Sequence, residues 1–298
     1  MKFKIIENIR DNAIPNIEKL ICYDENSSET VIQKLSIGDK IFKLEMFFRY
    51  DYPKISIDNK GRLNLSSTEF NDNTFELDGD DKHLPFQFGI VTGSFLLEKM
   101  DYLTTLKGCP RYVGGEFSVT NCESLTSLKH GPEIVGEGYF AYQNSLKTLE
   151  GAPKYTPKQF SVWENELTSL KGGPEYVGGG YTAQKNYLSN LEGAPIYVGM
   201  QFDIRQQTVF DFYSDFASYT KLKNLKGIPK YIGTLRMSEN NDLNYDNINE
   251  IKYIESPIIG NIPIFNRKFI PTMIAPSSTN TNVDIISTYK TNKYFYFV

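Results

Sequence analysis

The sequence contains few side chains whose type and spacing could support catalysis. It has only two histidines, His83 and His130, and its three cysteines form no CxxC pair. Few residues could therefore form a Ser/His or Cys/His catalytic dyad, and no phosphate-binding glycine loop follows a strand-like segment. The cysteine spacing indicates no zinc site, and the acidic stretch 78–81 fits no defined calcium loop. We expect a protein that is not an enzyme and needs neither metal nor cofactor.

Aromatic side chains are better candidates, because they could form contacts with a partner. Trp163 is the only tryptophan, and Phe140 and Tyr142 lie a little more than twenty residues before it. Aromatic residues and arginine provide most of the energetically important contacts of protein–protein interfaces. Whether these three side chains meet depends on the structural elements that carry them, and a sequence repeat specifies those elements.

The repeat is marked by proline. Successive prolines are spaced by 22, 21, 21 and 21 residues, and a last one follows after 34, which is 21 plus a 13-residue insertion: Pro110, Pro132, Pro153, Pro174, Pro195 and Pro229. Two leucines three residues apart precede each proline, and Tyr-Val-Gly-Gly or a relative follows it. Five of the six turns read Gly-x-Pro, and His130-Gly131-Pro132 is the variant. Such a period predicts a solenoid.

Spacing within one unit predicts the geometry of a coil. Phe160, Val162, Asn165, Leu167 and Leu170 fall at offsets 0, 2, 5, 7 and 10, and the units that begin at 139 and 181 repeat this pattern. Alternation at offsets 0 and 2 indicates one short strand per coil of about 21 residues, with those side chains inward. The asparagine should bond the exposed backbone of neighbouring coils as a ladder, and the leucines should fill the core.

The unit Leu-x-x-Leu-x-Gly-x-Pro-x-Tyr-Val-Gly-Gly-x-Phe resembles the leucine-rich-repeat-like arrays carried by tailed bacteriophages and some giant viruses. The resemblance covers about residues 58–250 and implies a leucine-rich-repeat-like solenoid with little helix on its convex side. It implies no single function, because such arrays serve many partners. A phage protein of this kind would act in host takeover or against host defence.

Two units depart from the pattern, and the chain ends lack it. Cys122 occupies the asparagine position, where we expect a buried structural thiol. In the last unit, spacing selects Arg236 and Ser238 as the inward pair, whereas hydrophobicity selects Leu235 and Met237. Residues 1–57 read as a small α/β cap with a strand at 2–6 and a helix beginning near Ser28. Residues 251–298 read as an irregular β C-terminal cap, or alternatively as a tail whose last strand pairs with a partner.

If offsets 0 and 2 point inward, offsets 1 and 3 point outward on the concave strand face. The candidate contact residues there are Phe140, Tyr142, Trp163, Gln184, Asp203 and Arg205. The insertion 208–220 adds Phe212, Phe216 and Tyr219, which would share one helical face. The alternatives are that terminal segments cover the aromatic residues and that the insertion packs on itself against the solenoid.

Composition limits the class of partner. A formal charge of −4 and a pI near 5.4 disfavour nucleic acid, and no apolar run is long enough to span a membrane. We expect a protein-binding scaffold in the cytoplasm, the host's if the protein is viral. The alternatives are a self-assembling virion or surface component and a carbohydrate-binding module.

Overall fold

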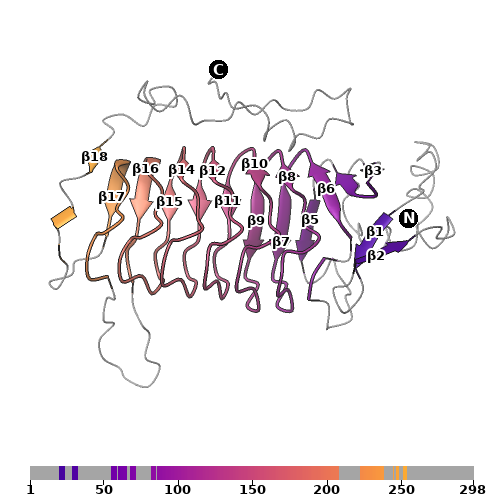
Figure 1. Ribbon diagram of the computed structural model, residues 1–298, viewed down its shortest axis with the longest axis horizontal. Coiled ribbons are helices and arrows are strands. Elements are labelled where there is room, and N and C mark those ends of the chain that lie inside the picture. The colour runs from indigo at the N-terminus through magenta and orange to yellow at the C-terminus, as the bar shows by residue number, and fades with distance from the viewer. Residues whose placement is uncertain are drawn as a thin grey trace, which may run out of the picture.

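The computed structural model describes residues 20–23, 29–32, 55–58, 60–65, 68–71, 82–84, 86–207, 222–237, 244, 246–247 and 251–253. Most of these residues form a parallel β-solenoid of about six turns, in which the coils follow one another along the long axis of the molecule (Figure 1). The described residues contain no α-helix. The predicted solenoid and its low helix content are therefore confirmed.

Each coil carries two short strands where the sequence predicted one. The first strand row follows the prolines and comprises β6 (Phe88–Val91), β8 (Tyr112–Val113), β10 (Ile134–Val135), β12 (Tyr155–Thr156) and β14 (Tyr176–Val177). The second strand row comprises β7 (Phe95–Glu98), β9 (Phe117–Thr120), β11 (Tyr139–Phe140), β13 (Phe160–Ser161) and β15 (Tyr181–Thr182). The one-strand prediction is wrong because the Tyr-Val pair was too short to show alternation.

A close approach of backbones explains the glycines between the two rows. At Gly136, an added Cβ would overlap the carbonyl oxygen of Gly114 in the preceding coil. The chain turns there from the first row to the second, and successive coils stack too tightly for a side chain on that side.

Longer strands join the two rows near the C-terminal end of the solenoid. β16 (Tyr197–Asp203) pairs with β14 through its first residues and with β15 through its last, and β17 (Tyr231–Arg236) continues both rows. β18 (Lys252–Tyr253) then pairs with β17, so the solenoid extends slightly beyond residue 250. In the last unit Leu235 is in register with Phe202, and Leu235 and Met237 pack against the core, so the inward pair is the one that hydrophobicity selected and not the one that spacing selected.

The N-terminal coils add strands on both rows. β4 (Leu63–Leu65) pairs in parallel with β6 and antiparallel with β3 (Ile55–Ile57), and β5 (Thr68–Asn71) pairs with β7. Farther upstream, β1 (Leu20–Tyr23) and β2 (Glu29–Ile32) form an antiparallel pair. The helix predicted to begin near Ser28 is wrong, because the β-branched Thr30-Val31-Ile32 run forms β2. The predicted strand at 2–6 and the tail beyond Tyr253 lie outside the described residues.

The core repeats one layer per coil. Aromatic rings at offset 0 contact one another from coil to coil, three pairs stacked and two tilted, with centroids 4.9–6.3 Å apart: Phe95, Phe117, Tyr139, Phe160, Tyr181 and Phe202. The leucine pairs before each proline are buried beside them. Stacking of this kind combines apolar burial with favourable ring geometry, so each coil is stabilised chiefly by its neighbours.

Candidate functional site

The outer face of the second strand row carries the predicted contact residues. We use outer face for the side chains at offsets 1 and 3 of the coils that begin at residues 117 to 202. Inward side chains at offsets 0 and 2 are 0–1% exposed in all of these coils, which confirms the predicted alternation. Phe140, Tyr142, Trp163 and Gln184 are partly exposed and Arg205 is exposed. These residues therefore line the outer side of one row of strands.

Two of the predicted aromatic residues form a stacked pair. The Tyr142 and Trp163 rings are 4.8 Å apart between centroids and 17° from parallel. Lys185 Nζ lies 5.7 Å from the centroid of the Trp163 ring and 3.6 Å from Glu164 Oε2. Trp163 is therefore held between a neighbouring ring and a cation, each supplied by an adjacent coil.

Phe140 is placed differently from the other two aromatic residues. A Cβ added to Gly138 would lie 2.5 Å from Cε2 of Phe140, so the ring lies over the backbone of the glycine just before its own strand. The absence of a side chain at Gly138 makes room for this position. The sequence placed the three aromatic residues in one cluster, and the structure resolves them into a stacked pair and a separate ring.

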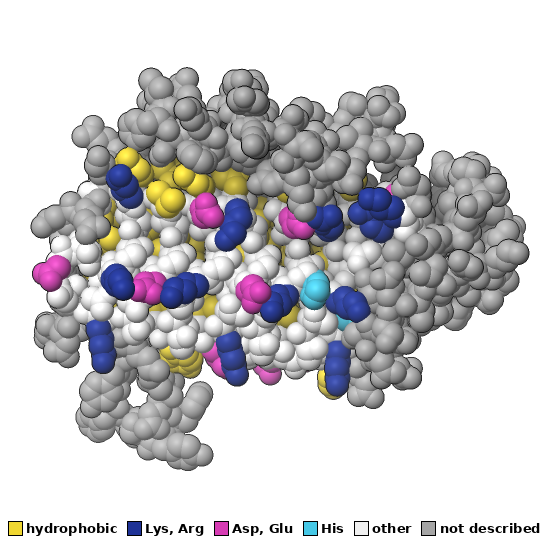
Figure 2. All heavy atoms as spheres, viewed as in Figure 1, with side chains coloured by type: hydrophobic (Ala, Val, Ile, Leu, Met, Phe, Trp, Pro, Cys, Tyr) yellow, Lys and Arg dark blue, Asp and Glu magenta, His cyan; other side chains and the backbone are white. Residues whose placement is uncertain are grey.

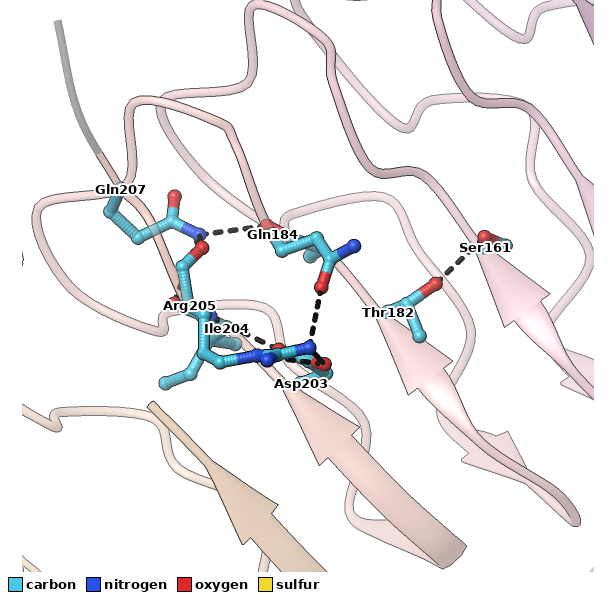
Figure 3. A network of polar contacts seen from close by, with 8 residues as sticks. Ser161, Thr182, Gln184, Asp203, Ile204, Arg205 and Gln207 are labelled. Carbon is cyan, nitrogen blue, oxygen red and sulfur yellow. Dashed lines mark hydrogen bonds and ion pairs between the residues drawn. The ribbon is translucent and has the colours of Figure 1, made fainter. Parts of the chain in front are cut away.

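A polar network continues the outer face toward the C-terminal coils (Figure 3). Arg205 donates from Nε to Asp203 Oδ1 at 2.9 Å and from Nη2 to Asp203 Oδ2 at 2.7 Å, and its Nη2 also reaches Gln184 Oε1 at 3.3 Å. Asp203 is only 2% exposed, so it orients the guanidinium from beneath. The hydrogen bonds to Asp203 also raise the pKa of Arg205. Of this pair, Arg205 is the group that a partner could reach.

The hydroxyl groups of two smaller outer residues bond each other across coils. The Ser161 and Thr182 hydroxyl oxygens are 2.7 Å apart, and both residues are buried. In register they lie in the same row as Asp203, beneath the exposed part of the outer face. Because both hydroxyls are buried and paired with each other, a partner cannot reach them.

A buried amide ladder fixes the turn that follows the outer face. Asn165 accepts from the Leu146 backbone N–H at 3.1 Å and donates to the Ala141 carbonyl at 2.9 Å, and Asn144 and Asn186 make equivalent bonds. The predicted asparagine ladder is confirmed. Gln207 extends it by accepting from Leu188 N–H at 3.1 Å, which its offset of 5 from Phe202 could have indicated.

The residue just before each ladder position adopts a left-handed backbone. Gln143, Glu164, Lys185 and Gln206 have φ between 53° and 56°. Non-glycine residues rarely adopt this conformation, and it recurs at the same position of earlier coils, at Lys99 and Asn121, so it belongs to the repeated turn itself. The turn carries the Lys185 side chain over Trp163, a contact that strand alternation alone could not predict.

Both cysteines whose side chains the structure describes are buried. Cys109 and Cys122 are free and buried, and the Cys122 thiol donates to the Thr120 carbonyl at 3.4 Å, which agrees with its predicted structural role. Burial, together with the nearby Cys122, raises the pKa of Cys109 well above its ordinary value. No cluster of potential metal ligands occurs in the described part of the chain, nor does a helix long and apolar enough to cross a membrane. The insertion with Phe212, Phe216 and Tyr219 lies outside the described residues, as does the acidic stretch 78–81.

Comparison with known proteins identifies no relative: no family model, no curated protein and no solved structure matches this chain.

Proposed function

We propose that this solenoid is a non-enzymatic scaffold that binds another protein through its outer face. The observation that carries the proposal is the row formed by Tyr142, Trp163 and Arg205 on consecutive or nearby coils, with each side chain held in place by its neighbours. Aromatic residues and arginine fixed before binding lose little conformational entropy when a partner docks. The resemblance to phage repeat arrays favours a host or viral protein as that partner.

The geometry of the aromatic pair argues against a sugar as the ligand. A carbohydrate stacks on the open face of a ring, whereas one face of Trp163 is covered by Tyr142 and Lys185 lies over the ring. A protein can instead contact ring edges and the exposed Arg205 guanidinium. The insertion 208–220 begins directly after Gln207, the residue that follows Arg205 and Gln206 in the chain. Its contacts with the partner would therefore extend the same surface.

The proposal is tested by capture of a partner from lysate, followed by measurement of its affinity for purified variants. Trp163→Ala/Tyr142→Ala should weaken binding at least tenfold, and Arg205→Ala should weaken it less. Tyr102→Ala is the matched control, because Tyr102 is 62% exposed and is not part of the outer face. Circular dichroism should show that all variants keep the wild-type fold.

The reverse pattern would reject the proposal. If the double variant binds as tightly as the wild type, or if the Tyr102 control loses as much affinity, the outer face is not the contact surface. If no partner is captured and the chain's mass rises with concentration, self-assembly becomes the better explanation.

A further inference from the structure

An apolar strip runs along the outer side of the first strand row. Successive side chains of a strand point to opposite sides, so one residue of each Tyr-Val pair points inward and the other outward. The inward residues, from Val91 to Ile232, are 0–1% exposed. The residues at the outward position are all aromatic or aliphatic, and we call them the tyrosine strip: Ile90, Tyr112, Ile134, Tyr155, Tyr176, Tyr197 and Tyr231.

The surroundings of the tyrosine strip have low polarity. Burial, and secondarily the nearby Tyr197, raises the pKa of Tyr155 to about 12, because the charged phenolate is poorly solvated there. Burial also raises the pKa of Tyr112 and of Tyr197. A Cβ added to Gly199 would lie 3.4 Å from Cε1 of Tyr197, so this ring lies over bare backbone. The strip therefore suits an apolar contact and not a charged one.

The apolar surface is widest at the coil of Tyr197. The residue after each repeat proline is charged in the other coils, whereas in this coil it is Ile196. Met200 follows where β16 bulges relative to β17, at a position that Gly179 holds in the preceding coil. Ile196 is 44% exposed and Met200 is 51% exposed, and hydrophobic side chains gather at the surface near these C-terminal coils (Figure 2). We call Ile196, Tyr197 and Met200 the apolar patch.

The chain carries a matching apolar segment next to the strip. β18 pairs with β17 so that Lys252 lies beside Tyr231, which brings the chain to the C-terminal end of the strip. Residues 254–276 follow, with seven isoleucines, two phenylalanines and a methionine but only three charged residues. Prolines at 257, 263, 271 and 276 rule out one continuous helix in which these apolar side chains could pack. The segment therefore gains most from an apolar surface on which to lie.

Distances along the solenoid allow the segment and the strip to meet. Neighbouring strands lie about 4.8 Å apart, so β16 is about 10 Å from β18, and the strip from Tyr231 to Ile90 is about 29 Å long. An extended chain advances about 3.3 Å per residue, so about nine residues would cover that length. Ile258 and Ile259 follow Tyr253 closely enough in the chain to reach the apolar patch.

We propose that residues 254–276 bind along the tyrosine strip in an extended conformation, with Ile258 and Ile259 on the apolar patch. The chain's own segment then covers the first strand row, and the outer face of the second row stays open to a partner. This assignment does not depend on the proposed function, because the strip and the outer face belong to different strand rows.

Disulfide trapping in the full chain tests this contact. Met200→Cys is combined in turn with Ile258→Cys, Ile259→Cys and Ile262→Cys, in a Cys22→Ser background. Cys109 and Cys122 are buried and do not compete. A disulfide needs Cα atoms within about 7 Å of each other, so a bond forms only where the segment lies on the patch. Under mild oxidation, at least one of the three pairs should close within the chain in most molecules, as read by mass spectrometry of peptides.

The yields of these bonds decide between the possible occupants. Tyr102→Cys with the same three partners is the matched control, because Tyr102 is 62% exposed but lies outside the strip, and it should close rarely. No bond within the chain, or equal yields with the Tyr102 control, would overturn the proposal. A bond between two chains would also overturn it, because a second copy would then occupy the strip.

Charge placed in the segment gives an independent readout. Ile258→Asp/Ile259→Asp should release the segment, because carboxylates are costly to bury, and should raise the fluorescence of an apolar dye several-fold with an unchanged circular dichroism spectrum. Asn261→Asp/Asn266→Asp adds the same charge without removing apolar side chains, so this control should keep wild-type fluorescence. Wild-type dye binding by the isoleucine variant would reject the contact.

Discussion

Side chains on the two sides of the second strand row follow different patterns. Toward the interior, every coil from Phe95 to Phe202 presents an aromatic ring at offset 0, and all are fully buried. On the outer face the residue one position later changes from Ser118 to Phe140 to Asp203 within five coils. The interior repeats because each coil must stack on an identical neighbour, whereas the outer face is free to differ. Variation on a repeated frame is what a specific binding surface requires.

Two phenylalanines on opposite sides of adjacent coils give the largest expected contrast. Phe160→Ala removes a ring stacked between Tyr139 and Tyr181 and leaves a cavity, so we expect a loss of about 4 kcal/mol in the free energy of unfolding. Phe140→Ala removes a partly exposed ring and should cost only about 1 kcal/mol. Urea denaturation followed by circular dichroism measures both, and equal losses would mean that the outer face is also core.

The amide ladder offers a second contrast within one coil. Asn186 accepts from Leu167 N–H and donates to the Val162 carbonyl while fully buried, so Asn186→Ala leaves buried backbone groups without partners. We expect a loss of about 3 kcal/mol. Gln184→Ala removes an outer amide that bonds only the exposed Arg205 side chain, and it should change stability by less than about 0.5 kcal/mol. Similar values for the two variants would show that the ladder adds nothing beyond a surface contact.

The interior was predictable from sequence because its geometry imposes a period. The offsets of Phe160, Val162 and Asn165 predicted burial and the ladder, and both are present. The first strand of each coil was missed because a Tyr-Val pair carries too little alternation to distinguish a strand from a turn. The helix predicted near Ser28 was wrong because the β-branched residues Thr30, Val31 and Ile32 favour the strand that forms there.

The candidate sites were less predictable, because they depend on contacts between coils. Strand alternation placed Tyr142, Trp163 and Arg205 on one face, but it did not show that Asp203 lies buried beneath Arg205. The Lys185 contact comes from a left-handed turn, which carries no period-2 signal.

A single threonine tests whether the repeated interior is optimal in every coil. Thr156 stands where other coils have Val113, Val135, Val177 and Val198, and its buried hydroxyl has no hydrogen-bond partner in the described structure. Thr156→Val keeps the branched shape and removes the unsatisfied group, so we expect a gain of about 1 kcal/mol in the free energy of unfolding. A loss of stability in thermal denaturation would indicate that an ordered water satisfies the hydroxyl.

The turn before each proline gives the smallest expected effect, and it tests whether this turn belongs to the repeated part of the coil or to its variable part. Five coils place glycine there, for example Gly151 with φ of 99°, whereas the variant coil places His130 at φ of 70°. A side chain at positive φ costs roughly 1 kcal/mol, partly offset by the greater freedom of glycine in the unfolded chain. His130→Gly should therefore raise the free energy of unfolding by about 0.5 kcal/mol.

Differential scanning calorimetry can resolve this change. Lys129→Gly is the control, because Lys129 is not at positive φ and this variant should lose stability. If His130→Gly destabilises the protein instead, the His130 side chain makes a stabilising contact. The turn of that coil would then vary as the outer face does and would not belong to the repeated interior.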